Sequence, residues 1–132
     1  MPMTRVLHRI LYVDDEVILQ KVTQVTLERL GGFTVAVAGS GAEALSIVGA
    51  FAPDLILLDV MMPGMDGPTT LRALRSRSDS ALIPVVLITA KAQACEIKRF
   101  NDLGVAGVVT KPFEPKELVN ILRTLLATYV QA

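Results

Sequence analysis

The chain has 132 residues, of which 52% are hydrophobic and 20% charged, so a single domain is expected over residues 1–132, with a core of about 8–128. Lysine and arginine together number 13, as do aspartate and glutamate, and this balance argues against direct binding of nucleic acid or of an anionic membrane surface. A single cysteine excludes an internal disulfide, and no apolar run approaches the ~18 residues of a membrane span, which favours a cytoplasmic location.

Five short apolar runs predict five β-strands. The first is ILYV at residues 10–13, and the others are FTVAV (33–37), LILL (55–58), PVVLI (84–88) and AGVV (106–109). Consecutive apolar positions, rather than alternation with polar ones, are typical of strands that are covered on both faces.

Segments with helical periodicity follow each of these runs. The first helix is expected to bury one stripe of residues before a Gly-Gly pair ends it: Leu19, Val22, Thr26, Leu27 and Leu30. The later helices are expected to begin at the capping box Ser40–Glu43, at Pro68, near residue 92 and at Pro115.

Strict alternation of strands and helices predicts an α/β fold, a doubly wound sheet of five parallel strands with five helices on its two faces. Such sheets bind ligands outside the carboxyl ends of their strands. Residues with suitable chemistry follow four of the five strands: Asp14 and Asp15, then Asp59, then Thr89 and Ala90, and finally Thr110, Lys111 and Pro112. The sequence therefore predicts a site at this edge.

Each of these residues has a simpler explanation when it is considered alone. Asp14 and Asp15 could cap the helix that follows them. Thr89 could be an ordinary strand-end residue, and Lys111 could lie in a solvated turn. Asp59, however, directly follows four aliphatic residues, where an unpaired carboxylate would be costly. The convergence of all these groups on one edge favours a functional site.

Three neighbouring carboxylates would repel one another, and a cation between them would relieve this repulsion. Oxygen ligands without histidine or cysteine favour Mg²⁺, or Mn²⁺, over Zn²⁺. The only histidine, His8, precedes the first strand and is expected at the opposite end of the sheet, in a structural or exposed role. A carboxylate nucleophile, a hard cation, a lysine and a hydroxyl are the components of a phosphoryl-transfer site.

Four motifs together resemble the receiver domain of bacterial two-component response regulators, a chemotaxis-regulator-like family with a flavodoxin-like (βα)5 fold. The motifs are ILYVDDE, LILLDVMMPGMDG, VVLITA and VTKPF, and they occur in the family's order and spacing over nearly the whole chain. The resemblance implies a phosphorylation-activated switch that signals by protein-protein contact. It also implies a histidine kinase or a histidine phosphotransfer protein as phosphoryl donor, and a separate output partner.

The resemblance assigns a role to each acidic residue of the site. Asp59 would be the phosphoacceptor and would also bind Mg²⁺. Asp15 would bind the ion directly and Asp14 mostly through water. The main-chain carbonyl of Met61 would complete the protein ligands.

The remaining roles concern the phosphoryl group. Thr89 and the neighbouring Ala90 would contact its oxygens, and Lys111 would pair with it in the active form. The Lys111–Pro112 peptide would be cis. Limited self-phosphorylation from small donors and self-dephosphorylation are expected.

Two further features set the lifetime and the output of the switch. Met61 and Lys91 occupy the positions that tune dephosphorylation in the family, and their size predicts a long-lived phospho-form. The output face is expected around Val105 and Val108, with a dimer on phosphorylation. Val108 stands where the family usually has an aromatic residue, so the usual rotamer exchange has no counterpart at this position.

Two alternative functions fit parts of the sequence. A Mg²⁺-dependent aspartyl-nucleophile phosphatase or phosphotransferase usually has a second acid two residues after the nucleophile, but Met61 stands there. A receiver-like scaffold that is never phosphorylated is disfavoured because all the expected site residues are present. The tails MPMTR and ATYVQA favour a stand-alone regulator over a segment of a longer regulator or hybrid kinase.

Overall fold

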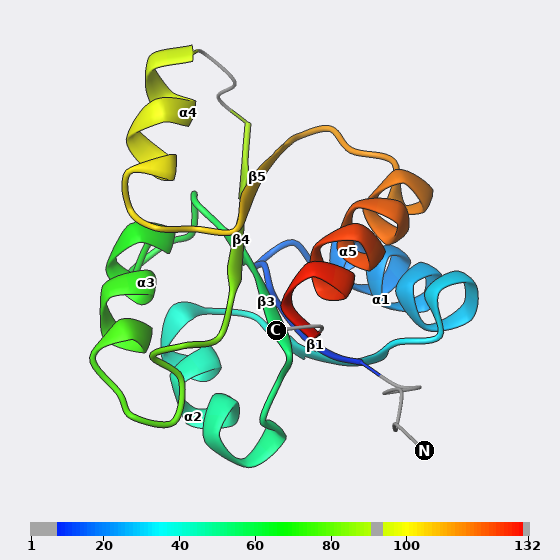
Figure 1. Ribbon diagram of the computed structural model, residues 1–132, viewed down its shortest axis with the longest axis horizontal. Coiled ribbons are helices and arrows are strands. Elements are labelled where there is room, and N and C mark those ends of the chain that lie inside the picture. Colours follow the sequence, from blue (N-terminus) through cyan, green and yellow to red (C-terminus); the bar gives the residue numbers. More distant parts are fainter. Residues whose placement is uncertain (1–7, 91–93, 131–132) are drawn as a thin grey trace.

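The computed structural model describes residues 8–90 and 94–130, and within them one parallel sheet is covered by helices on both faces (Figure 1). The strands are β1 (Arg9–Val13), β2 (Thr34–Ala38), β3 (Leu55–Asp59), β4 (Val85–Thr89) and β5 (Gly107–Thr110). The helices are α1 (Val17–Gly31), α2 (Gly41–Phe51), α3 (Gly67–Arg75), α4 (Ala94–Asn101) and α5 (Pro115–Val130). The predicted alternation of five strands and five helices is confirmed in the described part of the chain.

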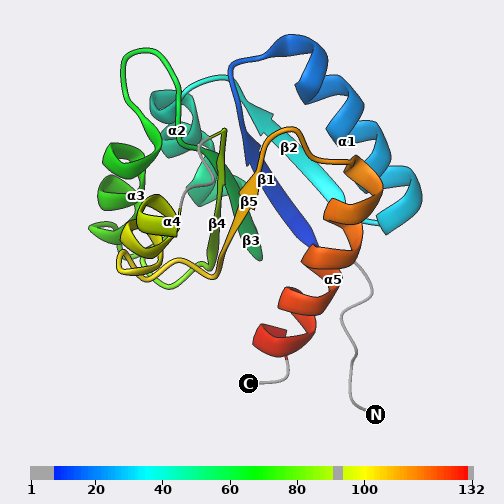
Figure 2. The same ribbon diagram turned by 90° about the horizontal axis from the view of Figure 1, so that it is seen from above.

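The sheet has the strand order β2-β1-β3-β4-β5, and all neighbouring strands are parallel. Helices α1 and α5 cover one face, whereas α2, α3 and α4 cover the other (Figures 1 and 2). The order of the strands reverses between β1 and β3, and ligands of such sheets bind outside the carboxyl ends of the strands at this switch point. The predicted doubly wound sheet is thus confirmed, and its topology indicates where a ligand would lie.

Strand limits differ from the predicted ones by about one residue, and the clearest case is Phe33. This residue was expected to begin the second strand, but its backbone N–H donates to the carbonyl of Leu27 at 3.2 Å. Gly32, with a φ of 71°, adopts the left-handed conformation that lets the helix end in this way. Phe33 therefore belongs to the C-terminal cap of α1, although its side chain is buried in the core.

The predicted buried stripe of α1 was partly wrong. Val22 and Leu30 are 48% and 51% exposed, whereas Thr23 and Leu27 are fully buried. The buried face is thus rotated by about one residue toward Thr23, while Leu27 packs into the core that α1 shares with α5. The helical spacing of apolar residues alone did not predict which residues beside this stripe would be buried and which exposed.

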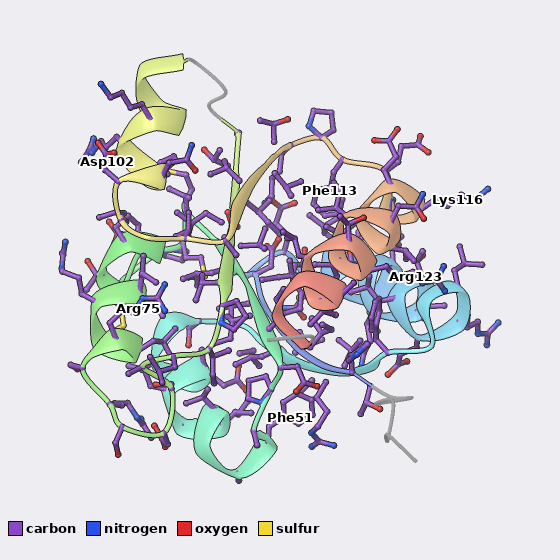
Figure 3. The ribbon with its side chains drawn as sticks, in the orientation of Figure 1. Phe51, Arg75, Asp102, Phe113, Lys116 and Arg123 are labelled. Carbon is purple, nitrogen blue, oxygen red and sulfur yellow. The ribbon has the colours of Figure 1, made fainter. Side chains whose placement is uncertain are left out.

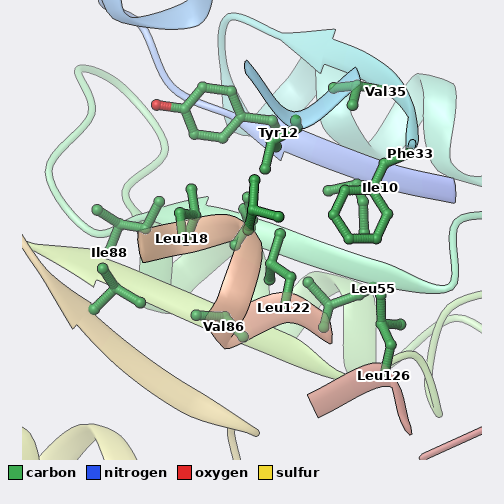
Figure 4. Packing of buried hydrophobic residues seen from close by; sticks show 14 residues of the cluster. Ile10, Tyr12, Phe33, Val35, Leu55, Val86, Ile88, Leu118, Leu122 and Leu126 are labelled. Carbon is green, nitrogen blue, oxygen red and sulfur yellow. The ribbon is translucent and has the colours of Figure 1, made fainter. Parts of the chain in front are cut away.

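Side chains of the central strands alternate between two cores, one on each face of the sheet. The core beneath α1 and α5 (Figure 4) takes Ile10, Tyr12, Leu55 and Leu57 from β1 and β3. The core beneath α2, α3 and α4 takes Leu11, Val13, Ile56 and Leu58. β3 is buried along its whole length, so the aspartate at its end has a rigid support.

The amino-terminal edge of the sheet carries His8 and Arg9. His8 is half-buried, and its ring lies 6.1 Å from that of Phe33, which agrees with the predicted structural role. The backbone N–H of Arg9 donates to Asp54 at 2.8 Å, and its Nε donates to the carbonyl of Phe51 at 2.7 Å. None of the helices in the described ranges is long and apolar enough to cross a bilayer.

Candidate functional site

The carboxyl edge of the sheet brings together residues from three strand ends. Asp14 follows β1 and Asp59 ends β3, and their side chains follow Tyr12 and Leu57 with the two-residue period of a strand. They therefore lie on the α1 and α5 side of the sheet. Asp14 is 0% exposed and Asp59 2%, whereas Asp15 is exposed.

Lys111, just after β5, contacts three carboxylates at this edge. Its Nζ lies 3.1 Å from Asp59 Oδ2, 3.3 Å from Asp14 Oδ2 and 3.2 Å from Glu16 Oε1. The lysine side chain is only 16% exposed. The Lys111–Pro112 peptide is cis, as the resemblance implied. One cation is therefore shared by three carboxylates, two from the connection between β1 and α1 and one from the end of β3.

The electrostatics of the site show the cost of this arrangement. Burial raises the pKa of Asp59 to about 6, and the charge of Asp14 adds to this shift, while the hydrogen bond from Lys111 opposes it. Burial also tends to lower the pKa of Lys111, but its hydrogen bond to Asp59 and the charges of Asp59 and Asp14 outweigh this and raise it. The positive charge of Lys111 therefore does not fully offset the cost of burying the Asp14 and Asp59 carboxylates.

The chemistry of the acidic groups fits a hard cation. Asp14, Asp15 and Asp59 each offer one oxygen, and these oxygens all lie within 4.8 Å of one another. An all-oxygen set of this kind suits a small divalent ion that keeps several of its waters, because the exposed Asp15 side is open to solvent. The structure thus brings together the three aspartates that the sequence singled out.

The loop between β3 and α3 shapes the floor of the site. The backbone N–H of Met61 donates to Asp59 Oδ1 at 3.2 Å, while the Met61 residue is 63% exposed. A Cβ at Gly67 would lie 2.7 Å from the carbonyl oxygen of Asp59, so only glycine lets α3 begin so close to the strand. Asp66 accepts a hydrogen bond from the backbone N–H of Thr69 at 2.9 Å and so caps α3.

Thr89 ends β4 on the opposite side of the sheet, because it follows the α3-facing Leu87 by two residues. A cavity of about 160 Å³ lies beside it and is also lined by Met61 and by Phe100 of α4. Val108 is half-buried and packs against the same core. Within this cavity lining, the aromatic residue is thus Phe100 of α4.

Other predicted residues lie at the rim of the site or outside the described ranges. Ala90 is exposed and, with Pro112, lines a cavity beside Lys111. Val105 is half-buried against the core that α4 covers. Lys91 lies outside the described residues.

Three contributors to the site were missed by reasoning from the sequence. Tyr12 donates a hydrogen bond from its hydroxyl to Asp14 Oδ2 at 2.8 Å, and the backbone N–H of Glu16 donates to Asp14 Oδ1 at 2.9 Å. The side-chain amide of Gln20 donates to the main-chain carbonyl of Asp14. Only Tyr12 had a sequence signal, because a tyrosine two residues before an aspartate in a strand shares its face.

Comparison with known proteins agrees with this geometry. A family model for the response regulator receiver domain matches residues 10–123. The DNA-binding response regulator MtrA of Mycobacterium tuberculosis is 42% identical over 118 residues, which cover 89% of this chain and 50% of MtrA. The transcriptional regulatory protein CseB of Streptomyces coelicolor is 35% identical over 123 residues, or 93% of this chain and 51% of CseB.

A solved structure of similar shape is the chemotaxis response regulator CheY4 of Vibrio cholerae. The TM-score is 0.83 and the sequence identity 28%, with 90% of this chain and 98% of that chain covered. The chain spans about half the length of the curated relatives it matches, and nearly the whole length of this solved structure.

Proposed function

This chain belongs to the response regulator receiver family, and on that premise we propose that Asp59 accepts a phosphoryl group in a Mg²⁺-dependent reaction. The observation that carries the proposal is the buried Asp59 carboxylate, which lies 3.1 Å from the Lys111 ammonium. Its oxygens also lie within 4.8 Å of those of Asp14 and Asp15. A nucleophile, a fixed cation and a ligand set for a second cation thus meet at one point.

The proposed reaction is an in-line displacement at phosphorus. A carboxylate oxygen of Asp59 forms the new O–P bond while the N–P bond of a phosphohistidine breaks. The electron pair of the broken bond returns to the imidazole nitrogen of the donor protein, which is a histidine kinase or a phosphotransfer protein. A bound Mg²⁺ would neutralise charge on the phosphoryl oxygens and on the acidic cluster.

The chain's own residues bind and orient the transferred group. Lys111 exchanges its contact with Asp59 for one with a phosphoryl oxygen, so its positive charge stays in the site throughout. Thr89 would turn its hydroxyl from the opposite side of the sheet, at the end of β4, and donate a hydrogen bond to another phosphoryl oxygen. The backbone N–H of Met61, which already donates to Asp59, helps to hold the attacking carboxylate in place.

The absence of an acid at position 61 supports a switch over a phosphatase. The exposed thioether of Met61 has no proton to give to a leaving alkoxide, so turnover of phosphomonoesters is expected to be slow. We propose that the phosphorylated chain acts through protein contact with an output partner. Its balanced charge supports this reading over direct DNA binding by the chain itself.

The test is incubation with acetyl phosphate and Mg²⁺, followed by intact-mass measurement. The wild-type chain is expected to gain the mass of one phosphoryl group, and Asp59→Asn is expected to gain none. Asp54→Asn is a matched control, because Asp54 lies at the other edge of the sheet beside Arg9. Phosphorylation of Asp59→Asn, or multiple-turnover hydrolysis of a phosphomonoester by the wild type, would contradict the proposal.

A further inference from the structure

We infer that Glu16 is a positioning residue that retains Lys111 in the resting protein and slows phosphoryl transfer from small anionic donors. This inference rests on the proposed function of Asp59. The observation that supports it is the ion pair between Glu16 Oε1 and Lys111 Nζ, which lie 3.2 Å apart at the exposed side of the site.

Glu16 occupies a helix-capping position but does not cap the helix. It is the N-cap residue of α1, and its side chain makes no capping hydrogen bond. Serine, threonine, aspartate and asparagine are preferred at such positions because their short side chains reach the free N–H groups of the first turn. The carboxylate instead reaches Lys111, 95 residues away in the chain. Departure from a local preference in favour of a distant contact is typical of functional sites.

Glu16 differs from the other two carboxylates that contact Lys111. Asp14 and Asp59 are buried and belong to the acidic cluster that fits a metal ion, whereas the Glu16 side chain is 61% exposed and lies outside that cluster. Glu16 is therefore not a member of the candidate ligand set. Its side chain is far more exposed than that of Lys111, at 61% against 16%, so its negative charge lies on the solvent side of the lysine.

The surroundings of the ion pair allow it to open. Glu16 and Lys111 line a cavity of about 330 Å³ whose other walls are mostly apolar: Leu19, Ala90, Pro112 and Phe113 (Phe113 is labelled in Figure 3). Apolar walls reduce the screening of the pair by water. The open volume gives the Glu16 side chain room to move aside when Lys111 turns to a phosphoryl oxygen.

Two consequences follow for the rate of phosphorylation. Lys111 has to leave Glu16 as well as Asp59 before it can neutralise the phosphoryl group, and the Glu16 charge itself repels a donor of the same sign. Both effects slow the reaction, and only the second depends on the charge of the donor. Acetyl phosphate, mainly a dianion at neutral pH, is therefore hindered more than phosphoramidate, which carries less net negative charge.

The test compares Glu16→Gln with Glu28→Gln, which makes the same change at an exposed position about 18 Å further along α1. Initial rates of phosphorylation are measured with both donors, in Mg²⁺, at low and high salt. Glu16→Gln is expected to react roughly threefold to tenfold faster than the wild type with acetyl phosphate at low salt. The gain is expected to be smaller with phosphoramidate and at high salt, and Glu28→Gln is expected to match the wild type.

The possible results distinguish a failure of this inference from a failure of the proposed phosphorylation of Asp59. If the wild type is phosphorylated and Glu16→Gln is no faster than the wild type with either donor at low salt, the inference is overturned and the function of Asp59 stands. An equal gain in Glu28→Gln would also overturn it. If neither donor phosphorylates the wild type, the proposed function is overturned and the inference falls with it.

Discussion

The two edges of the parallel sheet hold their charged residues in opposite ways. At the amino edge, Arg9 is half-buried with its guanidinium 4.2 Å from the centre of the Phe51 ring, and its backbone N–H and its Nε both donate hydrogen bonds. At the carboxyl edge, Asp14 and Asp59 are buried together and share Lys111. The first edge is arranged for stability, whereas the second retains buried negative charge that a divalent cation can neutralise.

This buried charge predicts a pH dependence of stability. The pKa of Asp59 is about 6 in the fold against an ordinary value of 3.8, so the folded protein favours the protonated carboxyl group. This contribution to stability is fully present below about pH 4 and is lost as the pH rises through about 6. It amounts to about 3 kcal/mol, since one pKa unit corresponds to about 1.4 kcal/mol.

This prediction is checked by urea unfolding of the metal-free protein between pH 4 and pH 8, with Asp59→Asn beside the wild type. The variant lacks the titrating group, so its unfolding free energy should exceed that of the wild type by up to about 3 kcal/mol near pH 8. The difference should shrink toward pH 4. A constant difference across the range would show that Asp59 is not the cause.

A second prediction concerns the effect of Mg²⁺ on stability. Mg²⁺ at about 100 times its dissociation constant is expected to raise the free energy of unfolding by about 2.7 kcal/mol, because it binds the folded state alone. Calorimetric melting curves with Mg²⁺ and then with excess EDTA measure the effect. Asp15→Asn, which changes the exposed member of the cluster, should abolish the increase. An increase that survives in this variant would place the ion elsewhere.

The contrast between the edges also explains what could be predicted from the sequence. Asp59 at the end of the apolar run 55–58, and Asp14 and Asp15 after the first strand, were predictable because strand direction alone brings strand ends to one edge. The contact of Glu16 with Lys111 was not, because it joins an exposed side chain to a loop 95 residues away. The spacing of residues in the sequence does not predict a contact of this kind.

Helix α1 also has one feature that could be predicted from the sequence and one that could not. The existence of α1 followed from its spacing of apolar residues, but the exposed Val22 and the buried Thr23 did not. Their placement depends on how closely α5 packs beside α1, which is a property of the assembled fold. Local pattern therefore predicted the elements, and packing between distant elements decided their faces.

A third prediction concerns a substitution that weakens contacts at the amino edge of the sheet. Arg9→Lys removes the hydrogen bond from Nε to the Phe51 carbonyl and the planar contact with the Phe51 ring, while it keeps the positive charge. The expected loss is about 1 to 2 kcal/mol in the free energy of unfolding. Phosphorylation by acetyl phosphate should proceed at the wild-type rate in the folded protein. A large change in that rate would mean that the two edges are coupled.

The smallest predicted effect comes from Tyr12→Phe, which removes one hydroxyl from the carboxyl edge. Burial and the adjacent Asp14 both raise the pKa of Tyr12 (labelled in Figure 4), so its hydroxyl remains protonated. This hydroxyl donates a hydrogen bond to Asp14 Oδ2. The loss of this bond is expected to cost about 1 kcal/mol of stability in the metal-free protein. Mg²⁺ affinity should fall roughly fivefold, because Asp14 is held less firmly in place.

Titration calorimetry with Mg²⁺ and urea unfolding with and without the ion separate these two effects. For Tyr12→Phe, the loss of stability should be larger in Mg²⁺ than in EDTA, because weaker ion binding adds to the lost hydrogen bond. For Arg9→Lys, it should be the same in both. A Tyr12→Phe loss that does not depend on Mg²⁺ would make Tyr12 an ordinary core residue, and the carboxyl edge would then owe its ion site to the three aspartates without support from the strand beneath them.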